Sequence, residues 1–219
     1  MSRDTKKVFK IFCEGTTEYN YFDGFRKNNR LTLALRPVNM EGGGYANFLA
    51  QLRKDGKTNC LAKFILIDGD LAASTPGELK NLKDLIAYCR QQNKKKSIPH
   101  ILMINCPDFE YAACLHSPEY TQQNYKQFLL SEFGYTGIDQ FKADQKVYEK
   151  LNTKNCSYIV LFKKCQGKMA AVVNRFSVKT AKYEIEVKTD FYESELNNKG
   201  TNMCDLFEIL KQFGEIEVK

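Results

Sequence analysis

Four short apolar runs alternate with segments of helical periodicity over the first half of the chain. The runs cover residues 7–13, 31–39, 63–68 and 100–105, and each is followed by a stretch whose apolar residues recur at helical spacing. Runs that are apolar throughout, with helices between them, are typical of a parallel sheet covered on both faces. The sequence therefore predicts an α/β fold with a central parallel sheet of about four strands flanked by helices.

The second half has a weaker pattern. Residues 120–133 and 143–151 look helical, residues 157–164 fit either a strand or a helix, and residues 181–187 alternate like a strand. Thr16 or Thr17 is expected to cap the first helix, Pro107 to open the helix after the fourth strand, and Thr201 to cap the closing one. We expect a core of residues 1–117 and a mostly helical extension of residues 118–219 packed on it.

The composition limits where the protein works. No run approaches the roughly 20 apolar residues of a membrane span, and the start "MSRDTKKVFKIF" lacks the features of a signal peptide. The eight cysteines are scattered singly without a CxxC pair, which favours reduced thiols buried in the core over disulfides. A zinc site would need closely paired ligands, and the chain has only two histidines. These features predict a cytoplasmic protein without membrane association.

Carboxylates follow three of the predicted strands. Glu14 ends the first strand, Asp68 and Asp70 follow the third in "FILIDGDLA", and Glu110 comes just after the fourth. The carboxyl ends of parallel strands meet at one edge of a sheet, where functional groups gather. Because residues i and i+2 of a strand share one side, Asp68 and Asp70 would point together if the extended conformation persisted through Gly69.

Carboxylates held this close repel each other unless a cation lies between them. Oxygen ligands are what Mg²⁺ or Mn²⁺ prefers, and Glu14, Glu18, Asp68, Asp70 and Glu110 would supply enough oxygens for two ions, as in-line attack on a phosphodiester often uses. Each piece also has a plainer explanation. Asp-x-Asp often forms a turn or a helix cap, and Glu18 can simply favour a helix N-terminus. His116 can be a helix-end histidine.

Positive charge is concentrated in one segment. Residues 146–182 hold nine basic residues and one acid, whereas residues 183–219 hold nine acids and four bases, although the whole chain carries only +7. A polyanion would fit the basic segment, whose lysines lie among aromatic residues that can stack on bases. We therefore predict nucleic-acid contacts at Lys163, Lys164, Lys168, Arg175 and Lys179. A lysine-rich face that is merely solvated is the equal alternative.

The motifs at the strand ends resemble those of the Toprim fold, and more closely those of its RloB-like family. The family's opening strand runs into a Glu-Gly and Thr-Glu pattern followed by tyrosine and phenylalanine, as in "FCEGTTEYNYF". Its Asp-x-Asp is similar to "ILIDGD", and its Asn-Pro-Cys-Phe-Glu stretch with a later histidine is similar to "NCPDFEYAACLH". The tail "NNKGTNMCDLFEIL" is similar to the family's closing helix, so the resemblance spans residues 7 to about 213.

The resemblance implies a Toprim-like, metal-binding catalytic core. In Toprim proteins the first glutamate and the aspartate pair bind divalent metal or assist proton transfer at a phosphodiester, and these roles fall on Glu14, Asp68 and Asp70. The RloB-like pattern adds Glu18, Glu110 and His116 as site residues, with the histidine contacting phosphate or positioning water. RloB-like proteins look like effectors of bacterial defence against phage, and related Toprim enzymes include nucleases that cut DNA or transfer RNA.

The leading hypothesis is that the protein is a Mg²⁺- or Mn²⁺-dependent endonuclease of RNA or DNA. Its catalytic residues would be Glu14, Asp68, Asp70, Glu110 and His116. A phosphatase of the haloacid dehalogenase type also places Asp-x-Asp after an apolar strand, but normally after the first strand rather than the third. The third hypothesis is a non-catalytic nucleic-acid-binding module, for which salt-sensitive binding without cleavage is expected. An activating partner protein and a homo-oligomer are both left open by the sequence.

Overall fold

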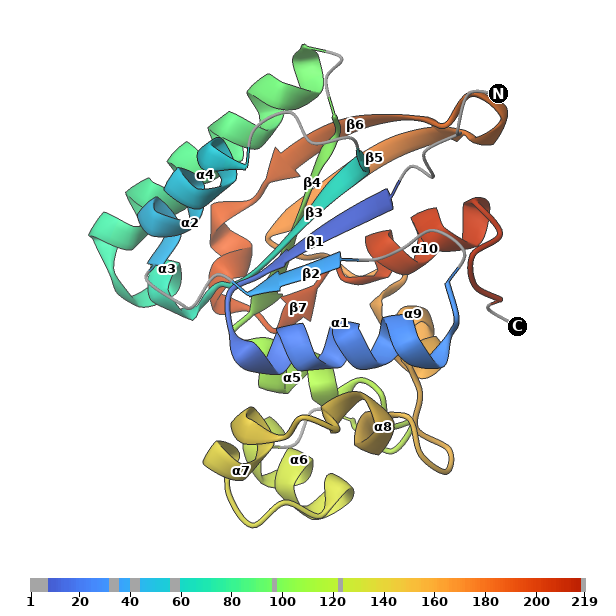
Figure 1. Cartoon of the computed structure of the whole chain (residues 1–219). Helices are drawn as coiled ribbons and strands as arrows, with labels where there is room; N and C mark the ends of the chain where they lie inside the picture. The colour runs from blue at the N-terminus through green and yellow to red at the C-terminus, as the bar shows by residue number, and fades with distance from the viewer. Residues whose placement is uncertain are drawn as a thin grey trace.

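The computed structural model describes residues 8–31, 36–39, 44–55, 60–95, 98–121 and 124–217. A five-stranded sheet in the order β2-β1-β3-β4-β7 forms its centre (Figure 1). The first four of these strands are parallel, and β7 pairs antiparallel with β4 at one edge. Their bounds are Val8–Cys13 for β1, Arg36–Asn39 for β2, Cys60–Asp68 for β3, His100–Cys106 for β4 and Gly200–Thr201 for β7. The predicted α/β class and parallel sheet are confirmed.

Strands β3 and β4 are buried on both faces, as their continuous apolar runs require. Alternate side chains enter two separate hydrophobic clusters: Phe64 and Met103 point to one face of the sheet, and Ile65 and Leu102 to the other. This alternation follows from the two-residue period of a strand.

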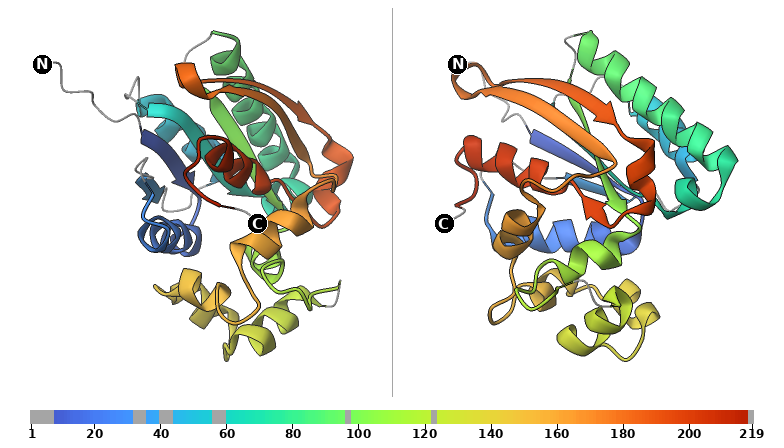
Figure 2. Two further views of the ribbon diagram at one scale, coloured as in Figure 1. Left: turned by 90° about the vertical axis from the view of Figure 1, so that its right-hand side faces the viewer. Right: turned by 180° about the vertical axis from the view of Figure 1, so that it is seen from behind.

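Helices cover each face (Figures 1 and 2). The aromatic residues of α1 (Thr16–Asn28) and the apolar side of α10 (Cys204–Gln212) enter one cluster, which also takes in the helices of the second half. The apolar residues of α2 (Gly44–Lys54) and α4 (Pro76–Lys94) enter the other. The short helix α3 (Asp70–Ser74) connects β3 to α4. None of the described helices combines the length and apolar character that a membrane crossing needs.

The second half is helical and also contains a hairpin. Its helices are α5 (Phe109–Cys114), α6 (Tyr125–Phe133), α7 (Ile138–Ala143), α8 (Val147–Leu151) and α9 (Tyr158–Cys165), with the short 3-10 helices η1 (Thr180–Lys182) and η2 (Glu193–Asn197). Strands β5 (Val172–Lys179) and β6 (Glu184–Phe191) form an antiparallel pair beside β4 and α4. The division at residue 118 stays a prediction, and β7 from the second half extends the sheet of the first.

Several local expectations are corrected. Residues 143–151 contain the end of one short helix and the whole of another, not a single helix, while the segment 157–164, which fitted either a strand or a helix, is helical. Gly15, not a threonine, is the N-cap of α1, and Pro107 precedes the N-cap Asp108 instead of opening α5. Thr201 lies in β7, so it does not cap α10. The part of the second predicted strand at residues 32–35 lies outside the described residues.

All eight cysteines are free thiols, and six of them are buried. The expectation of reduced core cysteines is therefore confirmed. Among the described residues no histidine or cysteine belongs to a group of three that could hold a metal ion as the side chains stand.

Gly24 sets how closely α1 packs on α8. A Cβ at this position would lie 2.5 Å from Cβ of Tyr148, which is closer than two carbon atoms approach. We expect Gly24→Ala to lower the free energy of unfolding by about 1–2 kcal/mol, since overpacking exceeds the helix propensity gained. Thermal unfolding would show a decrease of roughly 3–6 °C.

Gly77→Ala is the matched control for this prediction. Gly77 lies in α4 with no atom within 4 Å of its missing Cβ, so alanine there should raise stability by up to about 1 kcal/mol. An equal or larger gain from Gly24→Ala would contradict the packing argument.

Candidate functional site

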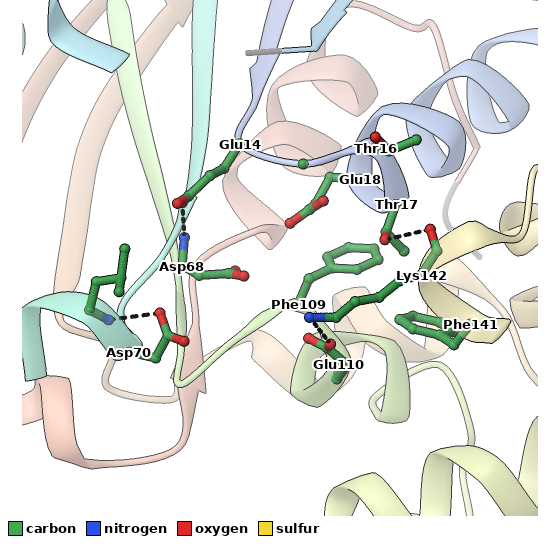
Figure 3. Close-up of a pocket in the computed structure, with 12 residues that line it drawn as sticks. Glu14, Thr16, Thr17, Glu18, Asp68, Asp70, Phe109, Glu110, Phe141 and Lys142 are labelled. Atoms are coloured by element: carbon green, nitrogen blue, oxygen red, sulfur yellow. Dashed lines mark hydrogen bonds and ion pairs between the residues drawn. The ribbon is translucent and has the colours of Figure 1, made fainter. Parts of the chain in front are cut away.

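One cavity of about 760 Å³ opens where β1, β3 and β4 end (Figure 3). It is lined by a group that is rich in carboxylates: Glu14, Gly15, Thr16, Thr17, Glu18, Asp68, Asp70, Leu71, Phe109, Glu110, Phe141 and Lys142. The structure thus brings the five predicted metal-binding residues into one cavity. Lys142 from α7 is the one basic residue in this lining.

Glu14 and Asp68 are held together by the main chain. The Asp68 amide N–H donates a hydrogen bond to Glu14 Oε2 across 3.1 Å, and the side chains of both residues face the same space in Figure 3. The Asp68 carbonyl accepts a 2.6 Å hydrogen bond from the hydroxyl of Tyr45, a buried residue in the first turn of α2. The end of β3 is therefore held both by the residue that follows the neighbouring strand β1 and by helix α2.

The Asp68 carboxylate is oriented by two buried side chains. Asn105 Nδ2 donates to Asp68 Oδ1 across 3.2 Å, and Asn105 Oδ1 accepts a 2.8 Å hydrogen bond from the Thr201 hydroxyl. Thr201 in turn accepts from the Met203 amide N–H across 3.2 Å. Neither Asn105 nor Thr201 lines the cavity, so both act on it through Asp68.

Asp70 is placed differently from what the strand pattern predicts. Gly69 has helical backbone angles (φ −97°, ψ −10°), and Asp70 is the first residue of α3, where its Oδ1 accepts from the Leu71 amide N–H across 2.7 Å. The extended conformation therefore ends at Asp68. A Cβ on Gly69 would lie 2.7 Å from Cys106 Sγ, so glycine lets this turn approach β4 closely.

Glu18 is folded back against the start of α1. Glu18 is only 5% exposed, and its Oε2 lies 2.8 Å from the position that a Cβ on Gly15 would occupy. The absence of a side chain at Gly15 thus leaves room for the carboxylate to face the cavity. A helix N-terminus favours the charged carboxylate, but burial opposes it more strongly here, as the pKa below shows.

Three carboxylates of the cavity are hard to ionise together. Burial, followed by the charges of neighbouring acids, raises the pKa of Glu18 to about 7. Burial and the charges of Glu18 and Glu14 raise the pKa of Asp68 well above its usual range. The pKa of Glu14 is also raised, first by burial and then by nearby Asp70 and Glu78, although the Asp68 N–H opposes the shift. A cation in the cavity would relieve this repulsion.

Glu110 and Lys142 face each other on the far side of the cavity. Lys142 Nζ lies 3.1 Å from Glu110 Oε1, yet this buried oxygen accepts no hydrogen bond. Partial burial lowers the pKa of Lys142, and the negative charge of Glu110 more than offsets this, so the pKa is raised overall. Thr17 helps hold α7 here, because its hydroxyl donates to the Lys142 carbonyl across 3.2 Å.

The carboxylates are the right type of ligand for a hard divalent cation, but their present positions are too far apart to coordinate one. Their oxygen donors are those that Mg²⁺ and Mn²⁺ prefer, and their pKa values are raised first by burial and then by the negative charge of neighbouring acids, which a cation would offset. As the side chains stand, however, no three acidic, histidine or cysteine residues among the described ones are close enough together to hold a metal ion. Binding would thus require side-chain rotation toward the ion.

His116 lies apart from the cavity. It is fully buried, its Nε2 is 2.8 Å from the Tyr21 hydroxyl, and its Nδ1 is 3.1 Å from the Ala113 carbonyl. Burial lowers its pKa to about 4, so the ring is neutral at physiological pH. The structure therefore does not bring His116 to the cavity, because the ring packs in the core against Tyr21 of α1, and its role at phosphate or water stays a prediction.

The predicted basic surface is partly used within the chain. Lys164 Nζ donates to the main-chain carbonyls of Ser117, Pro118 and Tyr120, while Arg175 pairs with Asp190, and Lys179 with Glu186, across the β5–β6 hairpin. These pairs explain part of the charge segregation, because a basic strand lies beside an acidic one. Lys163 and Lys168 are exposed. None of the five predicted basic residues lines the carboxylate cavity.

Sequence reasoning missed Lys142, Tyr45 and Thr17. Lys142 lies in a six-residue helix whose place beneath α1 depends on tertiary packing, so no spacing in the sequence links it to the strand ends. The sequence could have predicted a role for Asn105, because this residue ends the fourth predicted apolar run in "MINC", at the same sheet edge as the acids.

The model of one protein family, described as RloB-like protein, matches residues 9–210 of the chain. No curated protein and no solved structure matches it. The matched region contains every residue of the cavity and every residue that orients Asp68.

Proposed function

The chain belongs to the RloB-like protein family, and from this premise we propose that it is a metal-dependent endonuclease that cleaves phosphodiester bonds in RNA or DNA. A bacterial anti-phage defence role and transfer RNA as a possible substrate are part of the same proposal. Both derive from the resemblance of the motifs at Glu14, Asp68 and Glu110.

The observation that carries the proposal is the convergence of acids from three strand ends on one cavity. Glu14, Asp68 and Glu110 follow β1, β3 and β4, and burial keeps the pKa of Asp68 raised, as it does for Glu18. Several partly buried carboxylates that repel one another are unfavourable for folding, so a sheet edge with only a structural role would not need them. A divalent cation would supply the positive charge that the cavity lacks, and the bound cation would in turn attract the negatively charged phosphodiester.

Mg²⁺ or Mn²⁺ bound in this cavity would activate a water molecule and stabilise the charge that develops on the phosphate. Glu14 and Asp68 would be the main ligands, because the hydrogen bonds through Asn105 and the Asp68 N–H fix their orientation. Glu18, Asp70 and Glu110 would complete the oxygen shell. Without the ion, Glu18, whose pKa is about 7, can hold a proton near neutral pH, so the ion and the proton would compete for this carboxylate.

Lys142 is suited to stabilise negative charge on the substrate. Its side chain is 59% exposed and reaches into the cavity, and its raised pKa keeps it protonated. We expect Lys142→Met to lower the rate of metal-dependent cleavage by about 10²-fold, the scale of removing one charge-stabilising donor. The comparison is Lys146→Met, an exposed lysine four residues further on and outside the cavity lining. Equal rates for the two variants would rule out this role.

The experiment that tests the proposed function is incubation of the purified protein with labelled transfer RNA, another single-stranded RNA and duplex DNA. Each substrate is tested with Mg²⁺, with Mn²⁺ and with EDTA. Cleavage that requires the metal supports the nuclease and ranks its substrates. Salt-dependent binding without cleavage would instead support a non-catalytic module, and a trapped phosphorylated Asp68 would support the haloacid-dehalogenase-like phosphatase.

A further inference from the structure

Exposed lysines gather beside α5, the helix that carries Glu110 of the carboxylate cavity. Lys126 at the start of α6 and Lys199 before β7 meet at the ring of Tyr125, with Nζ atoms 5.7 and 5.3 Å from the ring centroid. Lys142 belongs to the cavity lining itself. We call Tyr125, Lys126, Lys142 and Lys199 the entrance surface. Residues far apart in the sequence thus place three positive charges beside the acids.

The entrance surface is anchored to the helix that carries Glu110. The Tyr125 hydroxyl donates to Asp108 Oδ2 across 2.9 Å, and Asp108 is the N-cap of α5, where its Oδ1 accepts from the Tyr111 amide N–H. Burial and Asp108 raise the pKa of Tyr125, and the charges of Glu110 and Asp70 add to the shift. The Tyr125 ring therefore lies within electrostatic reach of the cavity acids.

The lysines of this surface are accessible to a polyanion. Lys126 Nζ lies 3.5 Å from Asp108 Oδ2, but its side chain is 51% exposed and Asp108 already accepts two hydrogen bonds. Because the lysine end of this ion pair is exposed and the distance is long, the pair contributes no more than about 1 kcal/mol, and Lys126 can turn toward another anion. Lys199 is likewise exposed.

The hairpin end of the predicted basic segment is much further from the cavity. Lys179 and Tyr183 line a second cavity with Cys60 and Leu61, which begin β3, whereas Asp68 of the carboxylate cavity is the last residue of that strand. A strand of nine residues is roughly 30 Å long. Figure 1 shows this hairpin tip at the upper right and the ends of β1 and β3 at the lower left.

We propose, on the basis of the function proposed above, that the entrance surface binds the phosphates that flank the scissile one and that the substrate is a single-stranded nucleic acid. Glu18 and Glu110 are only 5% and 3% exposed, so the reacting phosphate must enter a recess. A single strand can bend to bring one phosphate into the recess while its neighbours stay on Lys126 and Lys199. A duplex resists such local bending, because its persistence length is about 50 nm.

The test is fluorescence anisotropy with a labelled single-stranded oligonucleotide, as RNA and as DNA, and with the corresponding duplexes. All proteins carry Asp68→Asn to suppress hydrolysis, and binding is measured with Mg²⁺ over about 50–200 mM salt. The double variant Lys126→Ala/Lys199→Ala is compared with Lys163→Ala/Lys179→Ala, which removes the same charge from the predicted basic segment. Thermal unfolding checks that both variants are folded.

We expect the Lys126/Lys199 variant to bind the single strand about tenfold more weakly than the parent. The slope of the logarithm of the binding constant against the logarithm of the salt concentration should decrease in magnitude by about 1.4, since each lost phosphate contact contributes about 0.7. The Lys163/Lys179 variant should stay within about twofold of the parent. Equal losses in the two variants, or a larger loss in the second, would overturn the assignment of the surface. Duplex binding as tight as single-strand binding would overturn the substrate class.

These outcomes are separable from those of the cleavage assay. Binding through Lys126 and Lys199 without any metal-dependent cleavage in the unmodified chain would leave the surface in place and remove the nuclease. Cleavage that is insensitive to both lysines would do the reverse.

Discussion

Asp68→Asn should reduce metal-dependent cleavage by about 10³-fold or more, because it removes charge from a carboxylate fixed at the centre of the cavity. The amide has nearly the same shape, and its oxygen can still accept the hydrogen bond from Asn105. The fold should therefore persist. Single-turnover cleavage of the best substrate, measured with Mg²⁺ and with Mn²⁺, gives the rate.

The control for this prediction is Asp84→Asn, an exposed carboxylate on α4 outside the cavity lining. It should cleave at the parental rate. Thermal unfolding without metal should show that Asp68→Asn is at least as stable as the parent, since one of the mutually repelling charges is gone. Cleavage by Asp68→Asn at the parental rate would remove this residue, and with it the proposed mechanism.

The second large effect concerns stability, pH and divalent ions. In EDTA, the free energy of unfolding should fall by roughly 1–2 kcal/mol between pH 6.5 and pH 8.5. The pKa of Glu18 is about 7 in the folded chain and 4.5 in its ordinary state, so the folded chain binds the proton more tightly. Stability from this proton is complete below pH 4.5 and is lost as the pH rises through 7. Asp68, whose pKa is also raised, acts in the same direction.

The lower limit of this pH range avoids an opposing effect. Burial lowers the pKa of His100 and His116 to about 4, so both favour folding increasingly as the pH rises from 4 toward 6.5 and change little above it. At pH 8.5, saturating Mg²⁺ should restore stability, by about 2.7 kcal/mol at a hundred times its dissociation constant. Urea unfolding at each pH, with and without the ion, measures both effects.

Glu18→Gln separates the carboxylate cavity from other titrating groups. This variant should have a flatter pH dependence in EDTA and a smaller gain from Mg²⁺, because it removes both the titrating group and one oxygen ligand. A pH profile identical to that of the parent would show that Glu18 does not carry the shift. Equal stabilisation by Mg²⁺ at pH 6.5 and 8.5 would argue against an ion that competes with protons in the cavity.

The sequence predicted the layout of the sheet and the position of its acids because both depend on local patterns. Continuous apolar runs identified β3 and β4, and the strand-end rule brought Glu14, Asp68 and Glu110 to one edge. The sequence did not decide whether the strand continues through Gly69, because the close approach of Gly69 to Cys106 is a tertiary contact that the period of a strand does not encode.

Features of the second half were less predictable for the same reason. Whether residues 157–164 form a strand or a helix depends on which neighbours bury their apolar side, and α9 packs on α10. The pairing of Arg175 with Asp190 is set by the register of the β5–β6 hairpin, so net charge along the sequence overstated the basic surface. Lys126 and Lys199 meet at Tyr125 only after α6 and β7 have both reached α5.

The hydrogen bonds of Asn105 have a consequence for the order in which the protein folds. Its carboxamide joins residues separated from it by 37 positions toward the N-terminus and by 96 toward the C-terminus. Loops of this length close at an entropic cost before their contacts form, and such long-range contacts slow folding. Before β7 docks, Asn105 lacks its hydrogen bond from Thr201, so the side chain that orients Asp68 is not yet held. The geometry of the cavity therefore requires the C-terminal part of the chain to be in place.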